Sequence, residues 1–221
     1  MASGNFDFPL ILLAAGKSSR MGMPKGLLEI GDHTLLENQL KCFRIAGGSQ
    51  VVLALGEDRE QYFERLPGLK KTLGIWKRLF DVDLLTLINP NPDEGPFSSL
   101  LLAVEAVQEL KRPAAFILPV DVPAAGGTLW RLMANEMRPG VGLVKPVHLN
   151  KGGHPVLVSS PLLKNMAGIK SAHPEARLDL QLNKLPQNNI HLVKTDDAHI
   201  LINLNDPEQY RLFLNRHRLE T

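Results

Sequence analysis

The chain has 221 residues, of which 44% are hydrophobic and 22% are charged, a composition typical of a folded globular protein and not of a disordered one. Its 25 basic and 23 acidic residues leave a net charge of +2, which gives no support to nucleic-acid binding. The single cysteine, Cys42, cannot form an internal disulfide, and the first apolar run is too short to span a membrane and has no basic leader. We therefore expect a cytoplasmic protein with neither a membrane nor a nucleic-acid partner.

Short apolar runs bounded by turn residues recur along the chain and predict β-strands. Several are continuous, as in Ile-Leu-Leu and Phe-Ile-Leu, which is typical of strands buried on both faces of a sheet. Amphipathic stretches between them predict helices. In chain order we expect strand 9–15, helix 34–45, strand 50–55, helix 57–66, strand 82–88, helix 98–111, strand 114–120, helix 128–137, strands 141–147, 155–158, 190–193 and 200–204, and helix 207–216.

The alternation of strands and helices in the first half predicts right-handed crossovers and a mostly parallel sheet. After Gly140 the pattern becomes irregular, so we expect this half to add strands to one sheet edge and to cover the mouth of a cleft. Residues 67–80 could form an extra helix, although the basic residues in this stretch are more simply explained as a solvated face. We expect residues 1–221 to form a single α/β domain.

Ligands of such sheets bind beyond the carboxyl ends of the strands, so the loops after the strands carry the candidate site. The first loop follows a buried strand with small residues and then several cations within a few positions. Small residues allow backbone N–H groups to approach an anion, and Arg20 and Lys25 could neutralise a polyphosphate. The spacing of Gly16 and Gly22 fits neither a Walker A loop nor a dinucleotide-binding fingerprint.

This string, Leu13-Ala14-Ala15-Gly16-Lys17-Ser18-Ser19-Arg20-Met21-Gly22-Met23-Pro24-Lys25, resembles the L-A-[AG]-G-x-S-x-R-M-G-x-x-K signature of the MobA-like superfamily of molybdenum-cofactor nucleotidyltransferases. Similar segments follow in the same order: residues 89–100, 118–123, 153–156 and 196–209. The resemblance implies a Rossmann-like three-layer α/β/α sandwich, with a mostly parallel sheet and a short antiparallel addition. It also implies that the nucleotide-binding residues are Leu13, Ala14, Ala15, Gly16, Lys17, Arg20, Lys25, Asn89 and Ser98.

Asp121 ends the apolar run 115–120 and precedes a proline-terminated turn, so its carboxylate would point into the cleft. Mg²⁺ prefers one or two carboxylates together with water and phosphate oxygens, and the resemblance assigns Asp121 to this ion. An aspartate that merely caps a helix or turn is the alternative. Together with Arg20 and Lys25, Asp121 is the expected catalytic set.

The second metal ligand is less regular, because relatives often carry D-x-D-T-P-E-D where this chain has Asn203-Leu204-Asn205-Asp206-Pro207. Asn205 can still offer a carbonyl oxygen to a hard cation, although without charge. Asp206 and Pro207 also make a good helix start, so a purely structural role stays open.

His154 lies between two glycines and a proline, in a segment similar to the family's G-H-P-V. We predict that its imidazole contacts the acceptor substrate, although a structural histidine is nearly as plausible. 

The resemblance implies Mg²⁺-dependent transfer of NMP from an NTP to a phosphorylated acceptor with release of pyrophosphate. Ala15 in the signature and Pro24 before Lys25 are similar to the cytidylyl branch and favour CTP and molybdopterin, whereas Gly26, Asn203 and Asn205 depart from it. Two alternatives stay open: a sugar- or polyol-phosphate nucleotidyltransferase, and a nucleotide-binding module without turnover. Oligomeric state and protein partners cannot be read from the sequence.

Overall fold

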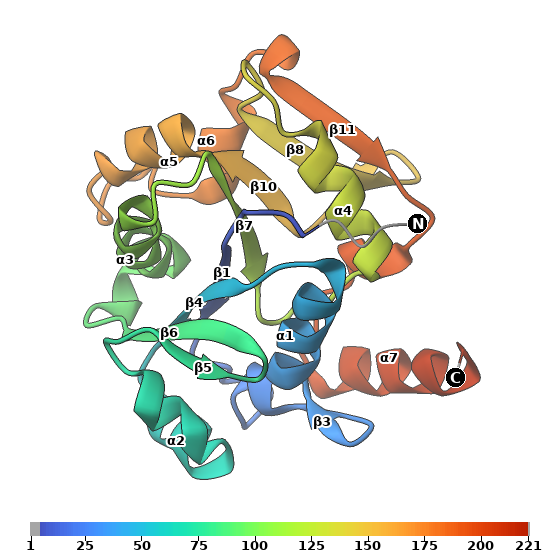
Figure 1. Cartoon of the computed structure of the whole chain (residues 1–221). Helices are drawn as coiled ribbons and strands as arrows, with labels where there is room; N and C mark the ends of the chain where they lie inside the picture. The colour runs from blue at the N-terminus through green and yellow to red at the C-terminus, as the bar shows by residue number, and fades with distance from the viewer. Residues whose placement is uncertain (1–4, 221) are drawn as a thin grey trace.

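The computed structural model describes the backbone of residues 5–220 and the side chains of residues 5–215. Within this part of the chain, nine strands form one sheet in the order β11-β8-β10-β7-β1-β4-β6-β5, with β9 paired to β8 (Figure 1). A separate short hairpin joins β2 to β3. The strands are β1 Leu10–Ala14, β2 Glu29–Ile30, β3 His33–Thr34, β4 Gln50–Leu55, β5 Lys77–Leu79, β6 Val82–Ile88, β7 Ala114–Pro119, β8 Leu143–His148, β9 Lys151–Gly152, β10 Val156–Ser159 and β11 Ile190–Lys194.

Helices connect these strands and cover both faces of the sheet. The α-helices are α1 Leu35–Ala46, α2 Arg59–Arg65, α3 Pro96–Glu109, α4 Gly127–Glu136, α5 Ser160–Ala167, α6 Leu178–Asn183 and α7 Pro207–Glu220, and the 3₁₀ helices are η1 Lys25–Leu27, η2 Pro67–Thr72, η3 Pro92–Glu94, η4 Gln187–Asn189 and η5 Ala198–Leu201. None of the helices in the described part of the chain has the length and apolar character needed to cross a membrane.

The predicted mostly parallel sheet is confirmed. β1, β4, β6 and β7 run parallel, and β11 runs parallel to β8. The antiparallel additions are β5 at one edge, β10 between β7 and β8, and the short β9. The chain passes from β1 to β4 and β6 on one side and returns to β7 on the other, so the strand order reverses at β1. This reversal places the carboxyl ends of β1 and β7 side by side, where open α/β sheets bind ligands.

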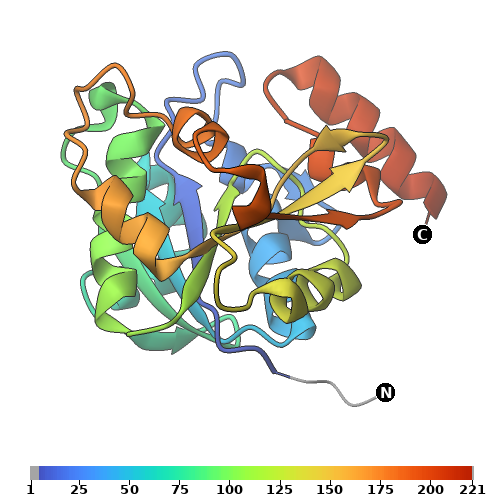
Figure 2. The same ribbon diagram turned by 90° about the horizontal axis from the view of Figure 1, so that it is seen from above.

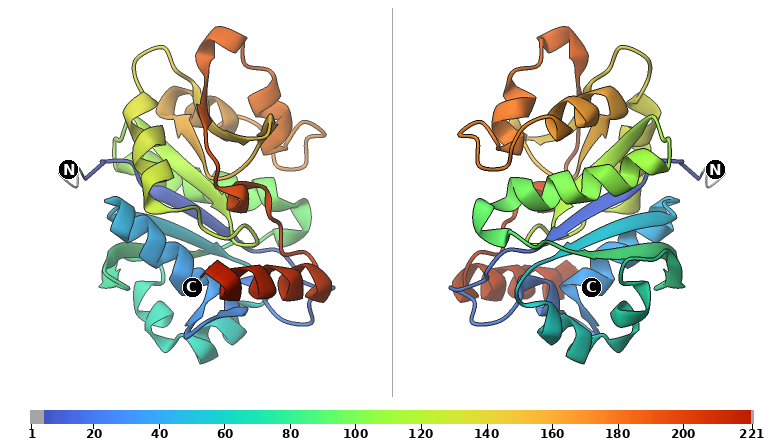
Figure 3. Two further views of the ribbon diagram at one scale, coloured as in Figure 1. Left: turned by 90° about the vertical axis from the view of Figure 1, so that its right-hand side faces the viewer. Right: turned by 90° about the vertical axis from the view of Figure 1, so that its left-hand side faces the viewer.

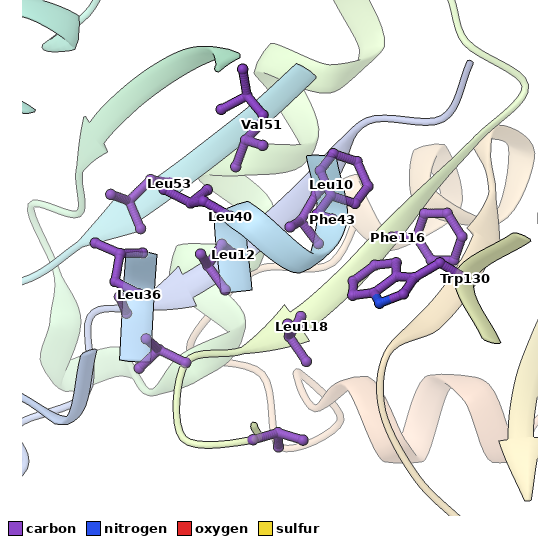
Figure 4. Close-up of a cluster of buried hydrophobic side chains, with 14 of the residues drawn as sticks. Leu10, Leu12, Leu36, Leu40, Phe43, Val51, Leu53, Phe116, Leu118 and Trp130 are labelled. Carbon is purple, nitrogen blue, oxygen red and sulfur yellow. The ribbon is translucent and has the colours of Figure 1, made fainter. Parts of the chain in front are cut away.

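Alternate residues of the central strands build two cores, one on each face of the sheet. Leu10 and Leu12 of β1 face α1, α2 and α4, whereas Ile11 faces α3, α5 and α6. Figure 4 shows the first of these cores, in which side chains of α1 and α4 pack against those of β1, β4 and β7. The two helical layers lie on opposite sides of the strands in Figure 2. The expected three-layer sandwich is therefore present.

Helix α1 shows how local sequence sets the ends of an element. Thr34 accepts a hydrogen bond from the backbone N–H of Glu37, and the Glu37 carboxylate accepts one from the Thr34 N–H, so the helix begins with a capping box. The helix stops at Gly47, whose φ of 110° suits a glycine better than any other residue. The apolar stripe of this helix, formed by Leu36, Leu40 and Phe43, is fully buried.

One predicted element is wrong, and a second stretch does not form the helix considered for it. Residues 200–204 do not form a strand: η5 ends at Leu201, and the chain continues without a strand partner. Ile200 and Leu204 are buried, so their apolar pattern reflects packing against the core and not sheet pairing. Residues 67–80 form η2 and the edge strand β5 in place of an α-helix. The basic side chains of this stretch are exposed, as the alternative of a solvated face predicts: Lys70, Lys71, Lys77 and Arg78.

Candidate active site

A cleft of about 670 Å³ opens at the carboxyl ends of β1 and β7. It is bounded by the loop after β1, by the loop that precedes α3, by the turn after β7 and by the segment that leads into α7. Its lining residues are Leu13, Ala15, Gly16, Lys17, Ser18, Ser19, Arg20, Lys25, Pro92, Asp93, Gly95, Pro96, Ser99, Pro119, Val120, Asp121, Asn203 and Asn205. The predicted Leu13, Ala15, Gly16, Lys17, Arg20, Lys25, Asp121 and Asn205 are thus brought together, whereas Ala14, Asn89, Ser98 and His154 are not in the lining.

The Lys25 side chain connects two walls of this cleft. Its Nζ donates to Oδ2 of Asp121 at 2.9 Å and to Oδ1 of Asn205 at 2.8 Å, so one ammonium joins residues that are 96 and 180 positions away along the chain. Only 17% of the Lys25 side chain and 23% of the Asp121 side chain are exposed. Partial burial strengthens a charge-assisted hydrogen bond relative to one at the surface.

The backbone around Lys25 is held from two sides. The Ser18 hydroxyl accepts a hydrogen bond from the Lys25 N–H at 3.2 Å, and Ser18 itself adopts a positive φ of 37°. On the other side, the buried Tyr62 hydroxyl accepts one from the Gly26 N–H at 3.2 Å. A Cβ at Gly26 would lie 2.6 Å from the Tyr62 oxygen, so this contact requires glycine. The departure at Gly26 from the cytidylyl pattern therefore accompanies a packing contact with α2.

The loop after β1 is also packed closely against the loop after β4. A Cβ on Gly56 would lie 2.6 Å from the Ala15 carbonyl oxygen, which leaves no space for any other residue. Arg20 lines the cleft from the same loop and is exposed. Lys17 pairs with Asp93 at 2.5 Å and more distantly with Glu57, and these contacts raise the pKa of the Lys17 ammonium, the hydrogen bond to Asp93 most of all.

A buried polar network shapes the wall formed by residues 91–96. The Asn89 amide donates to the hydroxyls of Ser98 and Ser99 at 2.8 Å each, and its oxygen accepts from the Asn91 N–H. The Ser98 hydroxyl donates to the Gly95 carbonyl at 2.7 Å. The predicted Asn89 and Ser98 therefore support the cleft wall from behind, because their polar atoms are used within the network, while Ser99 lines the cleft.

The segment before α7 is joined to the turn after β7 through its backbone. The Leu204 N–H donates to the Asp121 carbonyl at 2.8 Å, which brings the next residue, Asn205, beside the Asp121 side chain. Asp206 accepts a hydrogen bond from the Gln209 N–H and so caps α7, as its sequence predicted. Asn205 and Asp206 thus divide the two expected roles, one facing the cleft and the other starting the helix.

His154 is not among the residues that line the cleft. Burial lowers the pKa of its imidazole, so the ring is neutral near pH 7, and its Nδ1 is buried without a hydrogen-bond partner in the part of the chain that the structure describes. Its contact with an acceptor substrate stays a prediction. Asp93 and Ser99 also line the cleft, although neither was predicted from the sequence. Both lie within or beside the segment 89–100 already singled out, but no spacing rule separates lining residues from supporting ones there.

Comparison with known proteins identifies the family. Residues 10–185 match the MobA-like NTP transferase domain. The chain belongs to the MobA-like NTP transferase family. It is 25% identical over 201 residues to the molybdenum cofactor cytidylyltransferase of Escherichia coli K12, covering 90% of this chain and 92% of that protein.

Many solved structures share the fold of this MobA-like protein, and two of them illustrate it. A nucleotidyl transferase from Methanothermobacter superposes with a TM-score of 0.76 at 19% identity, and the match covers 99% of this chain and all of that one. Rv0371c of Mycobacterium tuberculosis H37Rv in complex with manganese superposes with a TM-score of 0.69 at 20% identity, covering 94% and 98%. The fold and the family are those of nucleotidyltransferases.

The oxygens of the cleft fit a hard divalent cation. Within the described residues, no group of three or more His, Cys, Asp or Glu side chains could hold a metal by itself. However, Asp121 Oδ2 and Asn205 Oδ1 already converge on one cation, the Lys25 ammonium. One carboxylate and one amide oxygen suit Mg²⁺, which keeps several waters and commonly takes substrate phosphates as further ligands.

Proposed function

We propose that this MobA-like NTP transferase, acting as one domain of residues 1–221, moves NMP from an NTP to a phosphorylated small molecule and releases pyrophosphate. CTP is the favoured nucleotide and molybdopterin the favoured acceptor. The observation that carries the proposal is the convergence of Lys25, Asp121 and Asn205 beside the loop after β1. The match to the E. coli cytidylyltransferase over 90% of the chain supports the choice of substrates.

The reaction is an in-line displacement at the α-phosphorus of the nucleotide. A phosphate oxygen of the acceptor forms a bond to this phosphorus, the bond from phosphorus to the bridging oxygen of the β-phosphate breaks, and pyrophosphate leaves with the electron pair. A phosphate monoester has a second pKa of about 6 and is already an anion at neutral pH. The attacking group therefore needs no strong general base, and catalysis depends on positioning and charge neutralisation.

The residues of the cleft meet these two requirements. Arg20 and Lys25 supply positive charge beside the loop that would hold the triphosphate, Arg20 through a planar fork and Lys25 as a point charge. Asp121 and Asn205 would hold Mg²⁺, which, when bound, neutralises phosphate charge and orients phosphate oxygens. Because the Lys25 ammonium now occupies both oxygens, we expect it to turn from them to the phosphates when the nucleotide and the cation bind.

A pyrophosphate-release screen tests the proposal. The protein is incubated with Mg²⁺, each of the four NTPs and a panel of acceptors that contains molybdopterin, a sugar phosphate and a polyol phosphate. Release with CTP and molybdopterin is expected. Release with a sugar or polyol phosphate alone would change the acceptor. Nucleotide binding without release in every combination would contradict the enzymatic proposal and support the non-catalytic module. The Asp121→Asn variant serves as the background control.

A further inference from the structure

Gln39 of α1 makes an unusual set of contacts below the cleft. Its side chain is fully buried, and its Nε2 donates to the carbonyl oxygens of Val122 at 2.7 Å and Val120 at 3.1 Å. A longer contact of 3.4 Å reaches the carbonyl of Pro119. The two close acceptors belong to the residues immediately before and after Asp121. One side-chain amide therefore holds the backbone on both sides of the candidate metal ligand.

The orientation of this amide follows from the acceptors. All three facing groups are carbonyl oxygens, so only the NH₂ end of Gln39 can bind them. Its other end, Oε1, is buried without a hydrogen-bond partner among the described residues. A glutamine on the inward stripe of a helix, with Leu36 and Leu40 as neighbours, is a poor choice for stability alone, because an unpaired buried oxygen is costly.

The carbonyl group between those of Val120 and Val122, which belongs to Asp121 itself, accepts a hydrogen bond from the Leu204 N–H at 2.8 Å. Three successive carbonyl groups are thus fixed, two by Gln39 and one by the segment that carries Asn205. The direction of the Asp121 side chain depends on the backbone that these bonds hold. Mg²⁺ demands near-ideal octahedral geometry with bonds of about 2.0–2.1 Å, so small errors in the position of a ligand are not absorbed.

We propose that Gln39 is a positioning residue for the reaction: it sets the place of the Asp121 carboxylate through the two adjacent carbonyl groups. This inference rests on the proposed function, because it assumes that Asp121 holds the metal. Gln39 lies outside the lining of the cleft, so it acts only through the turn after β7. Comparable supporting contacts around metal ligands are typically worth 10–100-fold in metal affinity or activity.

The test compares Gln39→Met with the wild-type protein. Methionine has a similar length and no donor. Affinity for Mn²⁺ alone is measured by water-proton relaxation, which needs no turnover, and kcat and KM are measured by pyrophosphate release. We expect Mn²⁺ affinity and kcat to fall by about tenfold or more, with little change in KM for the nucleotide. Gln39→Asn keeps the amide on a shorter side chain, so its Mn²⁺ affinity and kcat should lie between those of the wild-type protein and Gln39→Met. This variant decides the question if Gln39→Met does not fold.

Thr86→Val is the matched control. The Thr86 hydroxyl is buried and bonded to the Thr72 hydroxyl at 2.7 Å, away from the cleft, so valine also removes one buried hydrogen bond at nearly constant shape. The thermal stability of the Thr86→Val variant should fall without a change in its Mn²⁺ affinity. If the Gln39 variants lose stability as Thr86→Val does but keep wild-type Mn²⁺ affinity and kcat, Gln39 is only a structural tie and the inference is wrong. The same holds if the wild-type protein binds no Mn²⁺.

The test of Gln39 and the test of the proposed function can fail independently. If the wild-type protein releases no pyrophosphate with any substrate pair, the proposed function fails. The Mn²⁺ measurement still supports Gln39 as a positioning residue when Gln39→Met weakens Mn²⁺ binding and Thr86→Val does not.

Discussion

The two halves of the chain build their shares of the cleft in different ways. From β1 to β7, parallel strands alternate with helices, and the charged residues Lys25 and Asp121 follow strand ends that meet at the reversal of strand order. After α4 the chain adds β8, β10 and β11 at one edge and returns to the cleft through η5, which is not part of the sheet. It contributes neutral residues such as Asn205, which a backbone hydrogen bond from Leu204 to Asp121 brings to the cleft.

The regular half therefore supplies charge, with Asp121 fixed by the end of β7 and Lys25 fixed by the contacts of its loop with Ser18 and Tyr62. The irregular half supplies a neutral oxygen, whose position depends on the regular half. If this is correct, substitutions in the first half should cost more activity than those in the second.

Asp121→Asn should have the largest effect, because it removes a full charge beside the triphosphate at nearly constant shape. We expect kcat/KM for pyrophosphate release to fall roughly 100- to 1,000-fold, comparable to the loss of a key electrostatic group in other enzymes. Asp32→Asn, an exposed acid between β2 and β3, is the control and should have no effect. If the Asp121→Asn enzyme kept the wild-type rate and Mg²⁺ dependence, this cleft would not be the site of nucleotidyl transfer.

Lys25→Met should reduce transition-state stabilisation by about 2–4 kcal/mol, the range for a charge-assisted contact in a partly desolvated site. In contrast, the affinity of the variant for Mn²⁺ in the absence of nucleotide should rise, because the ammonium no longer occupies the oxygens of Asp121 and Asn205. Steady-state kinetics and water-proton relaxation measure the two effects. Lys71→Met, exposed on η2, is the control. Parallel loss of both properties would contradict the competition between Lys25 and the metal.

Asn205→Ala should cost less, about tenfold in activity, since it removes a dipole and not a charge. Asn205→Asp should tighten Mg²⁺ binding by adding a carboxylate. Both are read from Mg²⁺ titrations of pyrophosphate release, with the exposed Asn165→Ala of α5 as control. If Asn205→Ala were as harmful as Asp121→Asn, the contrast between the two halves would fail.

His154 should affect stability and its pH dependence. Burial lowers the pKa of the folded imidazole below the ordinary value of 6.5, so the unfolded chain takes up the proton first as the pH falls. The free energy of unfolding is therefore unaffected above about pH 6.5 and declines below it. Urea unfolding at several pH values should show this decline in the wild-type protein and a smaller one in His154→Gln. Equal slopes would indicate that His154 titrates normally.

Sequence patterns predicted the regular half well because continuous apolar runs, amphipathic stretches and the turn residues that bound them are local signals. They also placed Lys25 and Asp121, since strand ends in a parallel sheet share an edge. In the misassigned stretch 200–204, Ile200 and Leu204 are buried without strand pairing, and an apolar run does not distinguish a buried loop from a buried strand. Gln39 could not be found, because its acceptors lie 81 and 83 residues away and a single polar residue on a helix stripe gives no spacing to read.

A third, smaller core has a consequence for how the protein is made. Leu28, Ile30 and Leu35, which follow Lys25 closely in the sequence, pack against Leu204 and Phe213, so α7 lies beside the early hairpin (Figure 3). During synthesis the earlier strands emerge from the ribosome first and can begin to pair. The complete core must wait until the chain through Phe213 has emerged, and the contact between Lys25 and Asn205 must wait until Asn205 has emerged. A nascent chain stalled before that point would carry the sheet and most of the charges of the cleft, but not the completed site.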